Sequence, residues 1–152
     1  MREKILLCGP RSARAVTGVA LAFDLLIEGA EDRAISCKVI DATRGKIVSK
    51  SGTFSVRRSF DTLCVVVLVW WHLLRCQIYY ATMSTSNVGF IRDYLTVGVA
   101  KLLGRRIVLH LHGGGFKDFY INGKPWLQRI IRANLERTDT IVVLGELLKE
   151  QF

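Results

Sequence analysis

Short apolar runs alternate with longer amphipathic stretches along the whole chain. The short runs are bounded by polar or glycine-rich turns, which is the pattern of buried strands. Strands are predicted over residues 4–8, 35–41, 77–81, 106–112 and 140–144. Helices are predicted over residues 17–27, 54–75, 89–103 and 125–137, with another beginning at 145. Because strands and helices alternate, we expect an α/β fold: a Rossmann-like parallel sheet with helices on both faces.

Individual residues set the ends and the inward faces of these helices. Gly29 and Gly104 are expected to end the first and third helices, and Pro125 fits the first turn of the fourth. The polar stretch 44–53 is expected to be a loop or hairpin. In the first helix the period directs these side chains inward: Val19, Ala22, Phe23 and Leu26. In the third helix it directs these inward: Phe90, Ile91, Tyr94, Leu95 and Leu102.

The segment 54–75 is ambiguous, because Val65–Val67 favours a strand while the length favours a helix. We predict a helix. Its apolar part, residues 63–74, is twelve residues long, whereas a helix that spans a bilayer needs about 20, so it is not expected to span a membrane. We expect a buried core element. The alternative is a helix that lies on a membrane surface and is anchored by Trp70 and Trp71.

Composition and charge narrow the class of protein only in part. With 152 residues, half of them hydrophobic, the chain is expected to form one domain with one core. The formal net charge is +9. Such a charge attracts anionic lipid headgroups, a phosphorylated substrate or nucleic acid, unless the basic side chains are simply solvated. Nucleic acid is the least expected partner, because the chain has no basic tail, zinc-finger spacing or aromatic RNA-binding motif.

Four cysteines are spread over the chain, and no two of them form a C-x-x-C pair. They are Cys8, Cys37, Cys64 and Cys76. Isolated thiols in or beside apolar runs are typical of a reducing compartment rather than of a disulfide-stabilised secreted protein. We therefore expect a cytoplasmic protein, at the inner face of a membrane if the surface-helix alternative holds.

The segment 106–116, RIVLHLHGGGF, carries the strongest candidate chemistry. A strand that ends at His112 and runs into glycines 113–115 brings an imidazole and backbone N–H groups to the carboxyl end of a strand. Ligands bind at that end in α/β sheets. His110 points to the same face as His112, but a metal site needs a third ligand and only His72 remains among the histidines, so we expect no metal. For His112 a hydrogen-bonded position in the core is the alternative.

Two further loops are candidate binding segments. Gly18 opens a helix after the first strand, where its N–H can face an anion or a hydroxyl, although no dinucleotide fingerprint or P-loop occurs. An ordinary turn is the alternative there. Ser86, Asn87 and Arg92 follow the third strand and can hydrogen-bond a polar substrate, with N-capping of the helix as the alternative. The carboxylates are scattered and no G-x-S-x-G elbow occurs, so no catalytic dyad is predicted.

Taken in order, these segments resemble the N-terminal domain of a family 4 glycosyltransferase of the GT-B type. The matching pieces are 4–10 (KILLCGP), 17–18 (TG), 86–93 (SNVGFIRD), 108–113 (VLHLHG) and 139–144 (DTIVVL). Together they span nearly the whole chain. The resemblance implies an architecture of two Rossmann-like domains around a cleft. The N-terminal domain mainly holds the acceptor, and the C-terminal domain holds the nucleotide-sugar donor.

The resemblance also implies roles for individual residues. Gly18 would lie near the donor phosphates and the acceptor. His112 would lie beside the transferred sugar as the candidate catalytic residue, and Gly113 and Gly114 would let the chain pass close to the substrate. The other expected substrate contacts are Thr17, Ser86, Asn87, Arg92 and Phe116. Beyond the nucleotide-sugar co-substrate, neither a cofactor nor a metal is implied.

The chain departs from that family because it holds only one of the two domains. The family's acidic pair and basic phosphate-binding residues belong to the C-terminal domain, so we expect these 152 residues to be inactive without that domain or a partner subunit. The acceptor would be a saccharide or a lipid-linked saccharide. Two alternatives stay open. The sequence HGGGF is also similar to the oxyanion loop of lipase and esterase α/β-hydrolases, and a non-catalytic domain would bind a partner protein or an anionic membrane.

Overall fold

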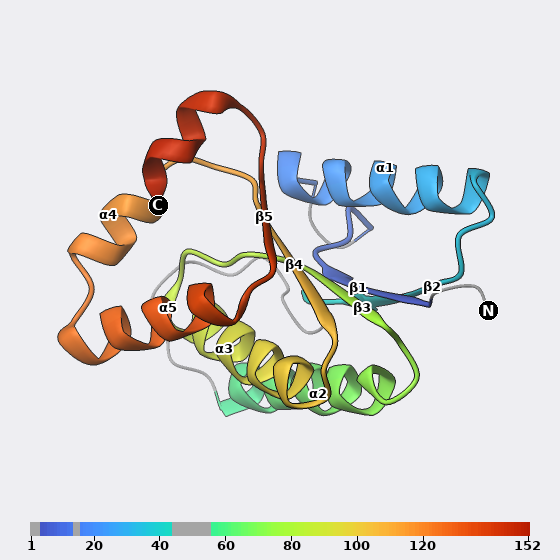
Figure 1. Cartoon of the computed structure of the whole chain (residues 1–152), viewed down its shortest axis with the longest axis horizontal. Helices are drawn as coiled ribbons and strands as arrows, with labels where there is room; N and C mark the ends of the chain where they lie inside the picture. Colours follow the sequence, from blue (N-terminus) through green and yellow to red (C-terminus); the bar gives the residue numbers. More distant parts are fainter. Residues whose placement is uncertain (1–3, 14–15, 44–55) are drawn as a thin grey trace.

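The computed structural model describes residues 4–13, 16–43 and 56–152. Its centre is a sheet of parallel strands in the order β2-β1-β3-β4-β5 (Figure 1). The strands are β1 (Ile5–Gly9), β2 (Cys37–Asp41), β3 (Ile78–Thr82), β4 (Arg106–Leu111) and β5 (Thr140–Val143). The predicted α/β fold with a parallel, Rossmann-like sheet is confirmed.

Helices cover both faces of the sheet, but unequally. They are α1 (Gly18–Asp32), α2 (Val56–Leu73), α3 (Asn87–Leu102), α4 (Phe116–Ile121), α5 (Pro125–Arg137) and the short 3₁₀ helix η1 (Glu146–Gln151). Figure 1 shows α1 on one face and α2, α3 and α5 on the other. The chain therefore leaves β1 toward one face and leaves β3, the neighbour of β1, toward the other. Sheets of this kind bind ligands in the crevice that such a divergence creates.

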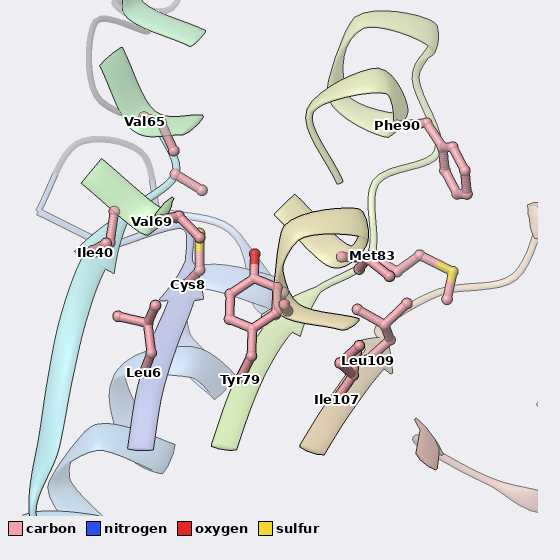
Figure 2. Packing of buried hydrophobic residues seen from close by; sticks show 14 of the residues in the cluster. Leu6, Cys8, Ile40, Val65, Val69, Tyr79, Met83, Phe90, Ile107 and Leu109 are labelled. Carbon is pink, nitrogen blue, oxygen red and sulfur yellow. The ribbon is translucent and has the colours of Figure 1, made fainter. Parts of the chain in front are cut away.

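The main hydrophobic core lies between the sheet and the helices of the three-helix face. Alternate strand residues such as Leu6 and Cys8 on β1 and Tyr79 on β3 point into it, together with Val65 and Val69 of α2 (Figure 2). A smaller cluster lies under α1. It consists of Leu7, Phe23 and Ile27.

Most predicted element boundaries agree with the structure to within a few residues. The helix predicted over 54–75 is α2, as far as the described residues reach, and Gly104 ends α3 with a φ of 65° as expected. The end predicted at Gly29 is wrong, because α1 continues to Asp32. The short helix α4 had no counterpart in the prediction, and the helix predicted from 145 is a 3₁₀ helix. The loop predicted over 44–53 lies outside the described residues.

The predicted inward faces of two helices are partly wrong. Leu26 of α1 is exposed, and so are Ile91, Leu95 and Leu102 of α3, the last with 87% of its surface accessible. The side of α3 that faces the core instead carries polar groups among its apolar ones. They are Arg92, Asp93 and Thr96. Because these groups bond to one another and to nearby loops, burial costs them little, and hydrophobicity alone does not identify the inward side.

Gly9, at the end of β1, lies directly beneath the Phe23 ring of α1. A Cβ atom added at Gly9 would come within 2.7 Å of ring carbons. We expect Gly9→Ala to lower the free energy of unfolding by about 1–3 kcal/mol, measured by urea denaturation, because the buried ring has to move. Gly18→Ala is the matched control, since an added Cβ there meets nothing within 4 Å. An equal loss in both variants would mean that the close approach of Gly9 to Phe23 is not what the substitution disturbs.

Candidate functional site

The segments that follow β1, β3 and β4 hold all the residues predicted for the site. Because these strands are parallel neighbours, the segments emerge at the same edge of the sheet. They then divide between the two faces (Figure 1). Gly18 begins α1 on one face, whereas Ser86 and Asn87 begin α3 on the other. The predicted residues therefore lie at one edge of the sheet, but Ser86 and Asn87 lie on the opposite face from Gly18.

Two stacked histidines mark the carboxyl end of β4. His110 and His112 point to the α1 side of the sheet, and their ring centres are 3.8 Å apart. The hydroxyl of Tyr80, on the neighbouring strand β3, lies 2.5 Å from His110 Nδ1. The Tyr80 ring in turn stacks on Phe23 of α1 at 6.3 Å. A continuous row of rings therefore leads from α1 across the sheet to His112.

The protonation states of these rings follow from their burial. Burial lowers the pKa of His110, and burial together with the neighbouring His110 lowers the pKa of His112 to about 4. Burial raises the pKa of Tyr80 to about 12. At neutral pH both imidazoles are uncharged and the phenol is protonated. A Tyr80 hydroxyl that donates to Nδ1 of His110 places the ring proton of His110 on Nε2.

His112 keeps its hydrogen-bonding capacity unused. Among the residues that the structure describes, no hydrogen-bond partner is found for either ring nitrogen of His112. Nε2 of His110 has no partner among them either. A neutral imidazole offers one donor and one acceptor. His112 is therefore equipped to bond an uncharged hydroxyl group, which both donates and accepts a hydrogen bond.

The low pKa of His112 makes stability depend on pH. In the unfolded chain His112 takes up a proton as the pH falls through 6.5, whereas in the folded protein it resists protonation down to about pH 4. Stability is thus fully present above pH 6.5 and declines from there toward pH 4. We expect a loss of about 1–2 kcal/mol over this range, reduced by solvent screening of a half-buried ring. His112→Asn should flatten the profile in urea melts at several pH values; an unchanged profile would contradict the prediction.

The glycine loop after His112 is exposed and open on its outer side. A Cβ atom added at Gly113 or Gly115 would meet nothing within 4 Å, and Gly115 needs its glycine because its φ is 92°. The N–H groups of Gly115 and Lys117 both donate to the side-chain oxygen of Gln151 in η1. The N–H groups of Gly115 and Lys117 therefore converge on one acceptor, which in this structure is the Gln151 amide oxygen.

Phe116 anchors the glycine loop to the core. Its ring is buried and lies 6.3 Å from the Phe90 ring and 5.0 Å from the Phe152 ring. This position holds the C-terminal end of the loop in place. The expected contact between Phe116 and a substrate stays a prediction.

The start of α1 is capped but accessible. Thr17 caps the helix, with its hydroxyl oxygen accepting the N–H of Ala20 at 3.2 Å. Gly18 is exposed at the first position. The loop before it is held by Asp24, which accepts hydrogen bonds from Ser12 and pairs with Arg11. The Ser12 hydroxyl is the main cause that lowers the pKa of Asp24. The backbone of Gly18 is therefore accessible to a ligand at the start of α1.

At the start of α3 the structure separates two kinds of residue. Ser86 makes no side-chain capping bond, and Asn87 is exposed, so both are free to meet a ligand. Arg92 is buried. Its guanidinium bonds Asp93, the Ser84 hydroxyl and the Ala42 carbonyl, and so ties the ends of β2 and β3 to α3. A direct contact between Arg92 and a substrate stays a prediction, and its visible role is to position these loops.

The part of the chain that the structure describes offers few other groups suited to metal binding or to nucleophilic chemistry. No cluster of three His, Cys, Asp or Glu side chains that would suit a metal is found there. All four cysteines are free, and burial raises the pKa of Cys8 to about 11, which keeps that thiol protonated and unreactive. Among the described helices none is long and apolar enough to cross a membrane.

The fold and this edge define the chain as an α/β protein of Rossmann-like type. No protein-family model and no curated protein matches it. Solved structures that resemble it over nearly their whole lengths include the following two. A conserved protein from Enterococcus faecalis V583 has a TM-score of 0.50 at 12% identity, covering 99% of this chain and 97% of that one. The CMP N-glycosidase BcmB of Clostridium botulinum has a TM-score of 0.47 at 14% identity, covering 98% and 96%. The likeness to the Enterococcus protein, at 12% identity, is informative about the fold alone, and the site must be judged by its own residues.

Proposed function

We propose that this chain is the acceptor-side half of a GT-B glycosyltransferase of family 4. It would help to move a sugar from a nucleotide-sugar donor to a saccharide or lipid-linked saccharide in the cytoplasm. A C-terminal domain or partner subunit would bind the donor diphosphate and complete the site. As the resemblance implies, we propose no metal on the acceptor side.

The state of His112 carries the proposal. Its ring is neutral, half-buried and unpartnered among the described residues, and it lies at the ligand-binding edge beside an open glycine loop. These properties suit a hydrogen bond to a sugar hydroxyl or to charge that develops on the transferred sugar. Gly18, whose helix covers the same face of the sheet, would add backbone N–H groups for a phosphate or hydroxyl. The order of the matching sequence segments is the second support.

The hydrolase alternative has weaker support. The loop could stabilise an oxyanion, but these 152 residues contain no G-x-S-x-G nucleophile elbow to form one. Labelling by a fluorophosphonate probe that is lost on substitution of a serine would favour the hydrolase and count against the transferase.

The proposal is tested by titrating the isotopically labelled protein, assembled with whatever second domain or subunit it carries in its source cells, with UDP-, GDP- and ADP-sugars and with free nucleoside diphosphates, followed by NMR. We expect one nucleotide sugar to shift the resonances of His112, Gly113 and Gly18 more than its free nucleotide does. In His112→Ala the additional shift should disappear while the rest of the spectrum keeps its dispersion. If the whole panel leaves this edge unshifted, also with saccharide acceptors added, the proposed function is wrong.

A further inference from the structure

Helix α2 is apolar on the side that faces solvent. From residue 60 to residue 74 every exposed residue is hydrophobic. These residues form the α2 ridge: Phe60, Leu63, Val67, Trp70, Trp71 and Leu74, with 37% to 65% of each surface accessible. At 3.6 residues per turn the six positions fall within a sector of about 100°, so the ridge is one stripe along the helix.

The opposite side of α2 is apolar as well, because it packs on the sheet. Val65, Val69 and Leu73 are buried there. A surface helix normally has one apolar stripe, which faces the core, so a second, exposed apolar stripe marks an interaction site. The α2 ridge therefore requires an occupant.

Neighbouring helix α3 widens this surface. Figure 1 shows α2 and α3 side by side on the face away from α1. The Trp70 indole N–H donates to the Leu95 carbonyl at 3.3 Å, and Leu95 and Ile91 of α3 are exposed next to it. The apolar area thus extends over two helices, which suits a binding partner with a broad, flat surface.

The charge around the ridge is positive. Arg75 follows it directly, with its guanidinium 5.8 Å from the centre of the Trp71 ring, and Arg105 reaches the Leu74 carbonyl. The acidic residues of α2 and α3 are Asp61, which is half-buried beside the ridge, and Asp93, which is buried against Arg92. Basic side chains at the end of an apolar, tryptophan-bearing stripe are complementary to anionic phospholipids.

We propose that the α2 ridge docks this protein on an anionic membrane surface. The helix would lie flat, with Trp71 and Leu74 at the boundary of headgroups and acyl chains and with Arg75 and Arg105 at lipid phosphates. None of the helices described is suited to cross a bilayer, so the contact is a surface one. The inference is independent of the proposed function, because α2 and the His112 edge share no residue.

Vesicle sedimentation tests the ridge with matched variants. Leu63→Ser/Leu74→Ser removes two ridge leucines that are 55% and 57% exposed. Leu21→Ser/Leu25→Ser makes the same change on α1, where the leucines are 48% and 66% exposed. At low salt we expect the wild type and the α1 variant to bind vesicles of phosphatidylglycerol and phosphatidylcholine equally well. The ridge variant should bind about tenfold to hundredfold more weakly.

A second variant tests the charge. Arg75→Gln/Arg105→Gln should bind these vesicles about tenfold more weakly than the wild type at low salt, and the difference should shrink at high salt. Circular dichroism of each variant checks that it is folded. Equal binding of the wild type to pure phosphatidylcholine vesicles would overturn the anionic part, and equal losses in the ridge and α1 variants would overturn the ridge. A dimer in sedimentation velocity that the ridge variant dissociates would assign the ridge to a second copy and overturn the membrane proposal.

Discussion

Arg92→Met is expected to lower the free energy of unfolding by about 3–5 kcal/mol, because it leaves the Asp93 carboxylate buried without its counter-charge. Arg92 Nη2 lies 2.6 Å from Asp93 Oδ1, and both side chains are almost inaccessible to solvent. Burial acts to lower the pKa of Arg92, but the charge of Asp93 and its hydrogen bonds, together with the nearby Cys8 and Tyr79, outweigh burial and hold that pKa above its ordinary value. Urea denaturation of the purified variant measures the loss.

A double variant separates the ion pair from the packing around it. In Arg92→Met/Asp93→Asn no buried charge remains, and the asparagine oxygen can still accept the Ser84 N–H that Asp93 Oδ2 binds at 2.8 Å. We expect it to be more stable than Arg92→Met alone, with a coupling of about 1–3 kcal/mol. Lys149→Met, which breaks the exposed pair with Glu146, should change stability by less than about 0.5 kcal/mol. A double variant no more stable than the single one would show that the cost lies in lost packing.

The alternation of strands and helices could be predicted from the sequence because it depends on local patterns. Buried parallel strands are short apolar runs, and Gly104 and Pro125 mark helix ends through their own backbone preferences. The inward faces depend on tertiary partners. In α2 apolar residues line both the exposed ridge and the buried side, and in α3 a buried Arg–Asp pair replaces apolar contacts, so the period of hydrophobic residues does not single out the core side.

The sequence was sufficient to predict that the site lies at the carboxyl edge of the sheet, but not which side chains contact one another there. The position of His112 before three glycines at the end of a strand indicated a ligand site, and the structure does place it at the carboxyl edge. The partnership of His110 with Tyr80 could not be foreseen, since it depends on which strands are neighbours. An adjacent arginine and aspartate in a helix was the available signal for the structural role of Arg92, because isolated charges are rarely buried.

His112→Ala is expected to lower kcat/KM for sugar transfer by about a hundredfold to a thousandfold, if the proposed function is correct. That is the usual effect of removing one preorganised hydrogen-bonding group from a reacting centre. The measurement needs the protein purified from its source cells, with whatever second domain or subunit it carries, and the nucleotide sugar identified by the titration. Because the ring has a pKa of about 4, the wild-type rate should show no titration of His112 between pH 6 and 8.

The control for this variant is His72→Gln, which changes a histidine on α2, on the other side of the sheet from the stacked pair. It should retain the wild-type kcat/KM. His112→Gln, which keeps one donor and one acceptor on a different frame, should recover part of the activity lost in His112→Ala, since it is the hydrogen bonds that the reaction needs. Rates for His112→Ala within about threefold of the wild type would place His112 among the structural histidines of the domain. The glycine loop and the start of α1 would then have to bind the sugar without it.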